Sequence, residues 1–190
     1  MTLDGDRLTT GKDSSGAAAT AVMRSVRAVR EFTDADVSDD ALEQILTVAR
    51  WTGSAQNRQP WSFVVVRAPE TLKALAELAP NARHIGRAPV AIAVVMPGDR
   101  AVLDAFDEGR VTERIMVAAT ALGLASGMGW VPKEAREDAC RLLGVPEELM
   151  LRTVIAIGHA APSAAKPRSD RGAARRPLEQ LVHRERWDPR

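Results

Sequence analysis

The sequence predicts an α+β fold in which a central mixed sheet is flanked by helices. Three short apolar runs, at residues 61–67, 89–96 and 153–157, have the pattern of buried strands. Stretches with helical spacing of apolar residues lie between these runs. The 190 residues suffice to bury one core without disulfides or a bound metal, so a single domain is expected.

Five helices are expected in chain order. The first covers residues 21–29, where valines recur at helical spacing with arginines on other faces. The second begins after Ser38, a good N-cap residue, and the third begins at Pro69. The fourth covers residues 111–124 and is apolar nearly all round, so it must be buried on every side. The fifth covers residues 133–143 and stops before a glycine.

Both ends of the chain differ in composition from its centre. Residues 1–20 are rich in Gly, Ser, Thr, Ala and Asp and lack an apolar run, which indicates a mobile leader rather than a signal peptide. The folded domain is therefore expected to cover residues 21–190. Beyond Pro162 the composition shifts to Arg, Ala, Ser and Pro, and apolar residues then recur up to Trp187. This C-terminal arm, at about residues 163–190, cannot fold on itself and must lie on another surface.

Charge and composition exclude several classes of function. The net charge of +1 gives no electrostatic reason to expect binding to nucleic acid or to an anionic membrane. The longest apolar run, residues 88–96, is too short to cross a bilayer. One cysteine and three scattered histidines offer no zinc-type ligand spacing, so no metal is expected. The single Cys140 favours a reducing compartment, and a cytoplasmic location is predicted.

Arginines gather near the start of the predicted domain. Arg27 and Arg30 are three residues apart, with Arg24 one turn earlier, so a helix would place them on neighbouring positions of one face. Converging guanidinium groups are suited to binding a phosphate. A solvated basic face is the alternative interpretation, and the spacing alone leaves both open.

A polar turn stands directly before the first predicted strand. It has the sequence Ser54-Ala55-Gln56-Asn57-Arg58-Gln59-Pro60-Trp61. Its hydroxyl and amide side chains offer both donors and acceptors, which suits a heterocycle with mixed polar edges. A plain turn that leads into a strand is the alternative.

Residues 24–32 and residues 54–61 together resemble two motifs of the FMN-dependent nitroreductase family. The resemblance extends over about residues 21–187. It implies a nitroreductase-like fold, an intertwined homodimer and FMN as the bound cofactor.

The resemblance implies which residues hold the FMN phosphate. By residue match, Arg27, Ala28 and Arg30 take the family's phosphate-binding positions, and Ala28 stands where the family has Ser. The phosphate would therefore depend more on guanidinium groups. Arg175 and Arg176 resemble a C-terminal basic pair that closes over the same phosphate, with Arg175 as the direct contact.

The groups around the flavin ring are implied in the same way. A glycine-rich segment resembles the family loop whose backbone N–H groups face the flavin N5 and O4 edge, namely Gly127, Met128 and Gly129. Such donors stabilise the reduced flavin. The polar turn matches a family turn that reaches across the dimer to the partner's flavin through Ser54, Asn57 and Gln59.

The resemblance also implies how two copies associate. The buried helix at residues 111–124 would lie at the twofold axis, and the C-terminal arm would wrap the other subunit. Gly53 stands where the family usually has Pro, which removes local stiffness.

The substrate pocket is expected to have a small roof, so that it is either open and poorly selective or shaped by two aromatic residues. About fourteen residues separate the strand that ends at Met96 from the helix expected near Val111, whereas larger relatives insert helices there. Phe106 and Trp130 are the residues expected to shape the pocket, with core packing as their alternative role. No side chain reads as an acid, base or nucleophile, which is expected where the cofactor carries the hydride chemistry.

The function expected from the resemblance is electron transfer from NADH or NADPH, through FMN, to a nitroaromatic, a quinone or a similar electrophile by a ping-pong mechanism. Three alternatives remain open. The protein could use a deazaflavin or catalyse a flavin reaction other than reduction, it could bind and sequester flavin without reductase activity, or the arginines and glycines could bind another phosphorylated ligand.

Overall fold

The computed structural model describes residues 10–165 and 175–188. Its centre is a four-stranded sheet in the order β1-β2-β4-β3. The strands are β1 (Ser62–Val66), β2 (Val90–Met96), β3 (Ala125–Trp130) and β4 (Met150–Gly158). The α-helices are α1 (Thr10–Ser25), α2 (Asp39–Arg50), α3 (Pro69–Leu78), α4 (Ala101–Ala121) and α5 (Arg136–Leu143). Five 3-10 turns complete the described elements: Ala55–Asn57, Pro80–Arg87, Lys133–Ala135, Pro162–Ala165 and Leu178–Gln180.

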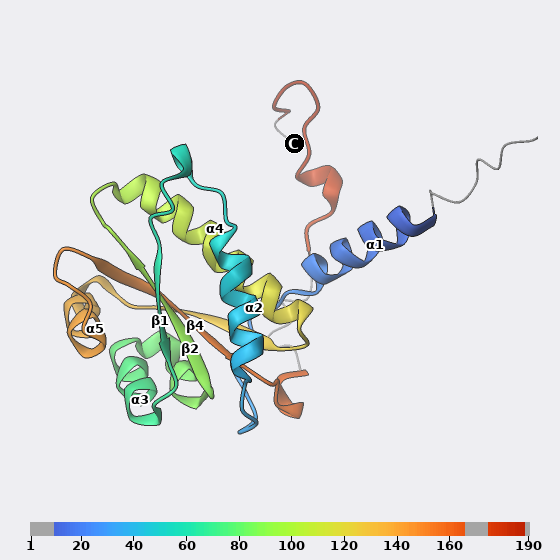
Figure 1. The fold of residues 1–190 in the computed structure, drawn as a ribbon. Coiled ribbons are helices and arrows are strands. Elements are labelled where there is room, and N and C mark those ends of the chain that lie inside the picture. Colours follow the sequence, from blue (N-terminus) through green and yellow to red (C-terminus); the bar gives the residue numbers. More distant parts are fainter. Residues whose placement is uncertain (1–9, 166–174, 189–190) are drawn as a thin grey trace, which may run out of the picture.

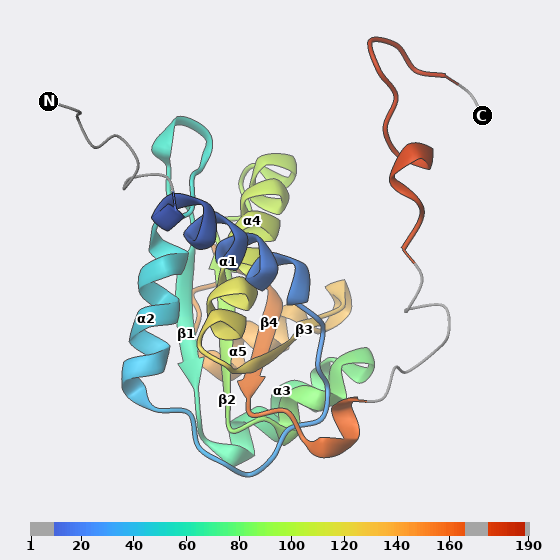
Figure 2. The ribbon, with the colours of Figure 1, turned by 90° about the vertical axis from the view of Figure 1, so that its right-hand side faces the viewer.

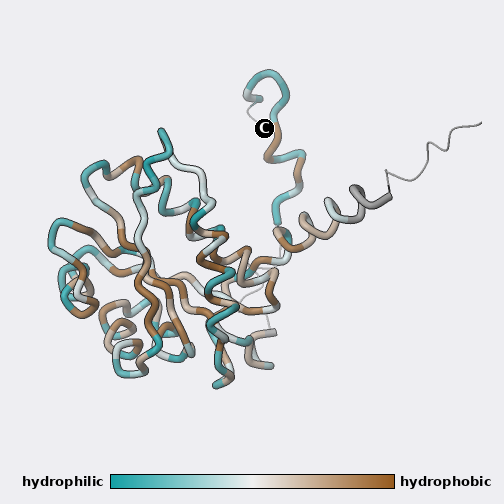
Figure 3. Tube along the Cα trace, viewed as in Figure 1, coloured by the Kyte–Doolittle hydropathy of each residue, from teal (hydrophilic) through white to brown (hydrophobic). Residues whose placement is uncertain are grey.

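The sheet is covered on both faces. Figure 1 shows α2 and α4 on one side of the strands and α3 and α5 on the other. Strand β2 is buried at every position because its side chains alternate between these two layers. Ile92 and Val94 pack with α2 and α4, whereas Ala91 and Ala93 pack with α3 and α5. In Figure 3 the strands accordingly carry the most hydrophobic residues, and the hydrophilic residues lie in the loops and along parts of the helices.

The predicted α+β class with helices on both faces is confirmed, but all three strand pairs are antiparallel. Strands β1 and β2 are adjacent because α3 and the turn Pro80–Arg87 form a helical hairpin that returns the chain to the end where β1 finished. Strands β2 and β3, joined by α4, run parallel to each other with β4 between them. Parallel pairing within the described residues is limited to the isolated bridge between Ala28 and Ser126.

Several predicted element boundaries are confirmed. The Ser38 side chain accepts a hydrogen bond from the N–H of Ala41 at 3.2 Å and so caps α2. Pro69 is the first residue of α3. The fifth predicted helix is a 3-10 turn followed by α5, and it stops at Gly144 in the left-handed conformation with φ 64°.

Two predicted helix starts are wrong. The first helix runs from Thr10 to Ser25 rather than over residues 21–29, so the expected domain boundary at residue 20 falls inside α1. The helix expected near Val111 begins at Ala101, so residues 97–100 alone connect it to β2. Its first three turns carry acidic residues that look solvent-exposed in the sequence, yet the fold buries them.

The C-terminal arm is described only in part, because residues 166–174 and 189–190 lie outside the described ranges. Figure 2 shows residues 176–188 standing away from the sheet and its helices. Their apolar side chains are exposed, with Trp187 at 79%. None of the helices in the described part of the chain is long and apolar enough to cross a membrane.

Candidate functional site

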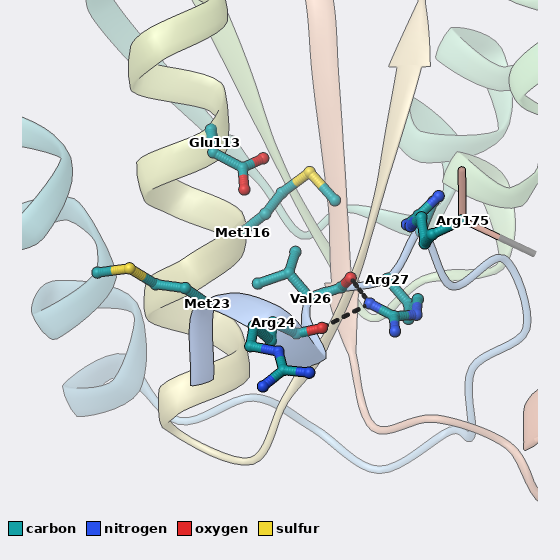
Figure 4. A pocket seen from close by; sticks show the side chains of 8 residues that line it. Met23, Arg24, Val26, Arg27, Glu113, Met116 and Arg175 are labelled. Carbon is teal, nitrogen blue, oxygen red and sulfur yellow. Dashed lines mark hydrogen bonds between the residues drawn. The ribbon is translucent and has the colours of Figure 1, made fainter. Parts of the chain in front are cut away.

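Three arginines meet in one pocket at the end of α1. The pocket is lined by Met23, Arg24, Val26, Arg27, Ala28, Glu113, Met116 and Arg175. Figure 4 shows Arg24 in the last turn of α1, Arg27 on the segment that follows it, Glu113 and Met116 on α4, and Arg175 at the start of the described arm. Segments that are far apart in the sequence therefore build a single basic pocket.

The end of α1 fixes Arg27. The helix stops at Ser25, and the guanidinium of Arg27 donates to the carbonyl oxygens of Arg24 at 2.8 Å and Val26 at 2.7 Å (Figure 4). Cations at this end of a helix are stabilised by the helix dipole. The prediction that Arg27 and Arg30 share a helical face is wrong, because both follow the last residue of α1.

The pocket arginines differ in their partners from Arg58, Arg110 and Arg152, each of which lies within ion-pair distance of a carboxylate on α4. Within the described ranges, no carboxylate forms an ion pair with Arg24, Arg27 or Arg175. Glu113 lines the same pocket and reduces its positive potential. An anion that enters would therefore find guanidinium groups without a competing salt bridge from the described carboxylates.

The segment after Arg27 joins the pocket to the sheet. Ala28 bridges to Ser126, and the N–H of Val29 donates to the carbonyl oxygen of Ser126 at 2.8 Å. A Cβ added to Gly127 would overlap the carbonyl oxygen of Val29, so only glycine permits this approach. The predicted phosphate segment and the predicted glycine-rich segment are thus in direct contact.

The glycine-rich segment is the strand β3, so its prediction as a loop is wrong. Gly129 allows the turn Pro80–Arg87 to pack closely against the strand. A Cβ on Gly129 would lie 2.6 Å from the Ile85 side chain and 2.7 Å from that of Ala82. A glycine with positive φ lies before the strand, at Gly123, where φ is 73°.

The backbone amide of Met128 faces the open edge of β3 beside the pocket. Ser126 directs its carbonyl oxygen outward to Val29, while the N–H of Val131 donates inward to Arg152 on β4. Successive residues of an antiparallel strand alternate in the direction of their backbone N–H and C=O groups. The backbone groups of Met128 therefore point outward like those of Ser126, whereas those of Gly127 and Gly129 point to β4. Of the three predicted residues, Met128 alone presents its amide to a ligand at that edge.

The polar turn has an unusual backbone. Gln56, Asn57 and Gln59 have φ angles of 55°, 54° and 48°, a region that side-chain-bearing residues seldom adopt. The hydroxyl of Ser54 accepts a hydrogen bond from the N–H of Gln59 at 2.8 Å and closes the turn. Arg58 points away from these residues towards α4.

The two predicted pocket aromatics are exposed, so the core-packing interpretation is wrong for both. Phe106 on α4 is 65% exposed, and the guanidinium of Arg110 lies 5.7 Å from its ring centre. Trp130 at the end of β3 is 49% exposed, with the guanidinium groups of Arg136 and Arg152 at 5.6 Å and 5.0 Å. Neither aromatic lines the basic pocket.

The predicted site residues fall into two groups on one chain. Arg27, Ala28 and Arg175 line the pocket, and β3 adjoins it, but Arg30 and Arg176 do not line it. Arg176 instead donates to the carbonyl oxygen of Gln180 at 3.0 Å. The polar turn lies beside the first turns of α4, whereas the pocket lies beside its C-terminal half.

Sequence reasoning missed the contributions of Glu113 and Met116. Both lie on the helix predicted from residue 111, and their separation of three residues places them on one face. The sequence therefore shows that the two side chains share a face, but not that the end of α1 and Arg175 lie opposite them. The described residues hold no group of three or more His, Cys, Asp or Glu side chains arranged to bind a metal.

Comparison with known proteins places these features in context. The family model of the Nitroreductase family matches residues 23–81, which contain Arg27, the polar turn and the start of the sheet. A protein of Archaeoglobus fulgidus that carries the name NADH dehydrogenase/NAD(P)H nitroreductase is 35% identical over 170 residues. That alignment covers 85% of this chain and 94% of the relative.

A more distant relative and a solved structure agree with this match. An FMN reductase (NAD(P)H) of Bacillus subtilis is 28% identical over 183 residues, covering 85% of this chain and 71% of the relative. The structure of NfrA2 from B. megaterium superimposes with a TM-score of 0.78 at 26% identity, over 90% of this chain and 75% of that one. The family resemblance predicted from the sequence is therefore confirmed: this chain belongs to the nitroreductase family.

Proposed function

We propose that this protein is an FMN-dependent oxidoreductase that passes electrons from NADH or NADPH to a nitroaromatic, a quinone or a similar electrophile. The observation that carries the proposal is the basic pocket of Arg24, Arg27 and Arg175 beside the open edge of β3. The names of the relatives, with FMN reductase and NAD(P)H nitroreductase among them, support the same activity.

The residues present fit the phosphate of FMN. Three guanidinium groups that lack carboxylate partners among the described residues converge there, and each charge-assisted hydrogen bond contributes about 1.5–3 kcal/mol. Ala28 offers no hydroxyl, so binding depends on the arginines and on backbone N–H groups. Arg30 and Arg176, which the resemblance implies as further contacts, join only if their segments move towards the pocket.

The open edge of β3 fits the ring of the same cofactor. The Met128 N–H faces outward and can donate to an acceptor on the flavin edge. Such a donor stabilises the reduced, anionic form. FMN, when bound, supplies the hydride-transfer chemistry, and the protein orients it and supplies this hydrogen bond.

A second copy of the chain completes the site. Ser54, Asn57 and Gln59 lie beside the first turns of α4, so the pocket near Glu113 of the same chain is not next to them. A homodimer in which each turn reaches the partner's pocket brings the two groups together. The exposed apolar side chains of the arm, Trp187 among them, supply a surface for wrapping the partner.

Substrates are bound in turn on the exposed aromatic side of the site. Phe106 and Trp130 offer flat apolar surfaces for a nicotinamide or an aromatic acceptor. In the ping-pong order, the oxidised nicotinamide leaves before the acceptor enters. No enclosing insertion follows β2, because residues 97–100 alone precede α4, and this favours broad acceptor selectivity. A cytoplasmic location remains part of the proposal.

An absorbance spectrum tests the cofactor and the activity together. The purified protein, supplied with FMN and washed, is measured before and after anaerobic addition of NADPH or NADH. Oxidised-flavin bands that bleach support the proposed reductase. Bands that persist favour a protein that sequesters flavin or uses another reductant, and protein that retains no flavin overturns the proposal.

A further inference from the structure

The polar turn of residues 54–59 adopts a conformation that needs external support. Three of its residues, Gln56, Asn57 and Gln59, have positive φ angles, and none of them is glycine. Such backbone persists only where surrounding contacts over-determine it. The hydrogen bond from the Gln59 N–H to Ser54 closes the turn but lies within it.

The support comes from a buried carboxylate on α4. Asp104 is 0% exposed, and its Oδ1 lies 3.6 Å from the guanidinium of Arg58, the residue between Asn57 and Gln59. Neither Asp104 Oδ1 nor the facing guanidinium nitrogen of Arg58 has a hydrogen-bond partner within the described ranges. Each of these buried charges is therefore compensated by the other. A second, exposed contact joins Arg58 to Asp99 at 3.6 Å.

The same carboxylate also anchors the beginning of α4. Its Oδ2 accepts a hydrogen bond from the N–H of Arg100 at 3.3 Å, at the first residue before the helix. The ion pair therefore attaches the turn to a rigid helix end rather than to a mobile side chain. An isolated charge at this depth is costly, so the pair strongly favours the one turn conformation that brings Arg58 to Asp104.

We propose that Asp104 is a positioning residue for cofactor binding, which acts through Arg58 to hold Ser54, Asn57 and Gln59 in their binding conformation. The inference rests on the proposed function, since it assigns the turn to FMN. Asp104 itself does not touch the cofactor. In the homodimer, the pair on one chain would set the affinity of the partner's site.

A matched pair of variants separates positioning from general stability. Asp104→Asn removes the charge but keeps an oxygen that can accept from the Arg100 N–H. Glu108→Gln is the control, because Glu108 is buried on the next turn of α4 and pairs with Arg152 of β4, away from the polar turn. Both variants lose one buried ion pair of the same helix.

Two measurements distinguish the variants. FMN affinity, from quenching of flavin fluorescence, is expected to fall about tenfold in Asp104→Asn, which is one decade on the binding scale, whereas Glu108→Gln changes it less than about twofold. Trypsin cleavage after Arg58, measured in the cofactor-free protein, is expected to accelerate in Asp104→Asn alone. Equal losses of affinity in both variants, or no loss in Asp104→Asn, would overturn the inference.

A double-mutant comparison tests the pairing even if one variant is less stable. Arg58→Gln changes the partner on the turn, and the double variant with Asp104→Asn is expected to be no weaker for FMN than either single change, because both break one interaction. Additive losses would contradict the pairing. Wild-type protein that takes up no FMN overturns the proposed function, whereas wild-type protein that binds FMN with Asp104→Asn unchanged overturns only the role of Asp104.

Discussion

The arginines beside the two halves of α4 differ in whether a carboxylate lies within ion-pair distance. Beside its N-terminal half, Arg58, Arg110 and Arg152 each face a buried carboxylate of the helix. Beside its C-terminal half, Arg24, Arg27 and Arg175 have no described carboxylate within ion-pair distance, although Glu113 lines their pocket. The charges of Arg58 and Arg152 are neutralised inside the fold, whereas Arg110 is 43% exposed.

The difference separates arginines that hold the structure from arginines that can bind a ligand. A neutralised guanidinium stabilises one local conformation but attracts an external anion only weakly. An unpaired one keeps its full attraction for a phosphate. Variants of the pocket and of the segments that position its arginines test this distinction.

The largest effect is expected from Gly127→Ala. Its new methyl group would overlap the Val29 carbonyl oxygen, so the segment carrying Arg27 must leave β3. Overpacking of this kind costs about 3 kcal/mol of unfolding free energy, and FMN binding is expected to be lost. Gly16→Ala on α1 is the control, since nothing lies within 4 Å of the position that its new methyl group would take, and the helix should gain about 0.5–1 kcal/mol. Calorimetry and flavin fluorescence measure both, and a stable, FMN-binding Gly127→Ala protein would contradict the assignment.

Removing the end of the arm is expected to have the next largest effect. A chain that ends after Arg176 keeps Arg175 but loses Leu178 and Trp187, which are 70% and 79% exposed. If these side chains wrap a partner, sedimentation should show a shift from dimer to monomer. The double substitution Leu178→Ser and Trp187→Ser should weaken the dimer in the same direction. Unchanged dimers in both proteins would refute the wrapping role.

A smaller, specific loss is expected from Arg27→Ala. The change removes one guanidinium from the pocket, and FMN should bind about tenfold more weakly, which corresponds to about 1.4 kcal/mol. Arg50→Ala, at the exposed end of α2, serves as the control and should leave the dissociation constant unchanged. Equal losses in the two variants would show that the pocket acts only through its overall charge.

The smallest effect is a gain. Glu113→Gln removes the carboxylate that lines the basic pocket, so the phosphate of FMN should bind about two- to fivefold more tightly, within the range of a single surface charge interaction. The gain should shrink as salt is added, because screening weakens the repulsion that Glu113 exerts. Weaker binding in Glu113→Gln would mean that this carboxylate orients an arginine rather than opposing the phosphate.

Sequence patterns predicted the parts of the fold that local chemistry decides. Ser38 capped a helix, Pro69 began one, and the unbroken apolar run of β2 marked a strand buried on both faces. The start of α4 was missed because Asp104 and its acidic neighbours look exposed, and only their arginine partners elsewhere in the chain make burial possible. Strand β3 was missed because its glycines weaken the strand pattern, and only the approach of Val29 to Gly127 and of Ala82 and Ile85 to Gly129 explains them.

The sequence pointed to some residues that line the pocket but not to their arrangement. The motif residues Arg27 and Ala28 do line a pocket, and Arg175 joins them from the far end of the chain. Their separation from the polar turn depends on the path of α4, which no local pattern reveals. The orientation of the Met128 amide depends on the strand register, which is equally invisible in the sequence.

Because Cys140 is the single cysteine of the sequence, association of two copies can be followed with a site-specific label. Its side chain is buried, and its thiol faces the Leu149 carbonyl oxygen at 3.9 Å, so a bulky maleimide dye should react with it slowly. A cysteine introduced near the tip of the arm would then take a label selectively under native conditions. Energy transfer between labels on two copies could therefore report the distance between arms without first removing the natural thiol.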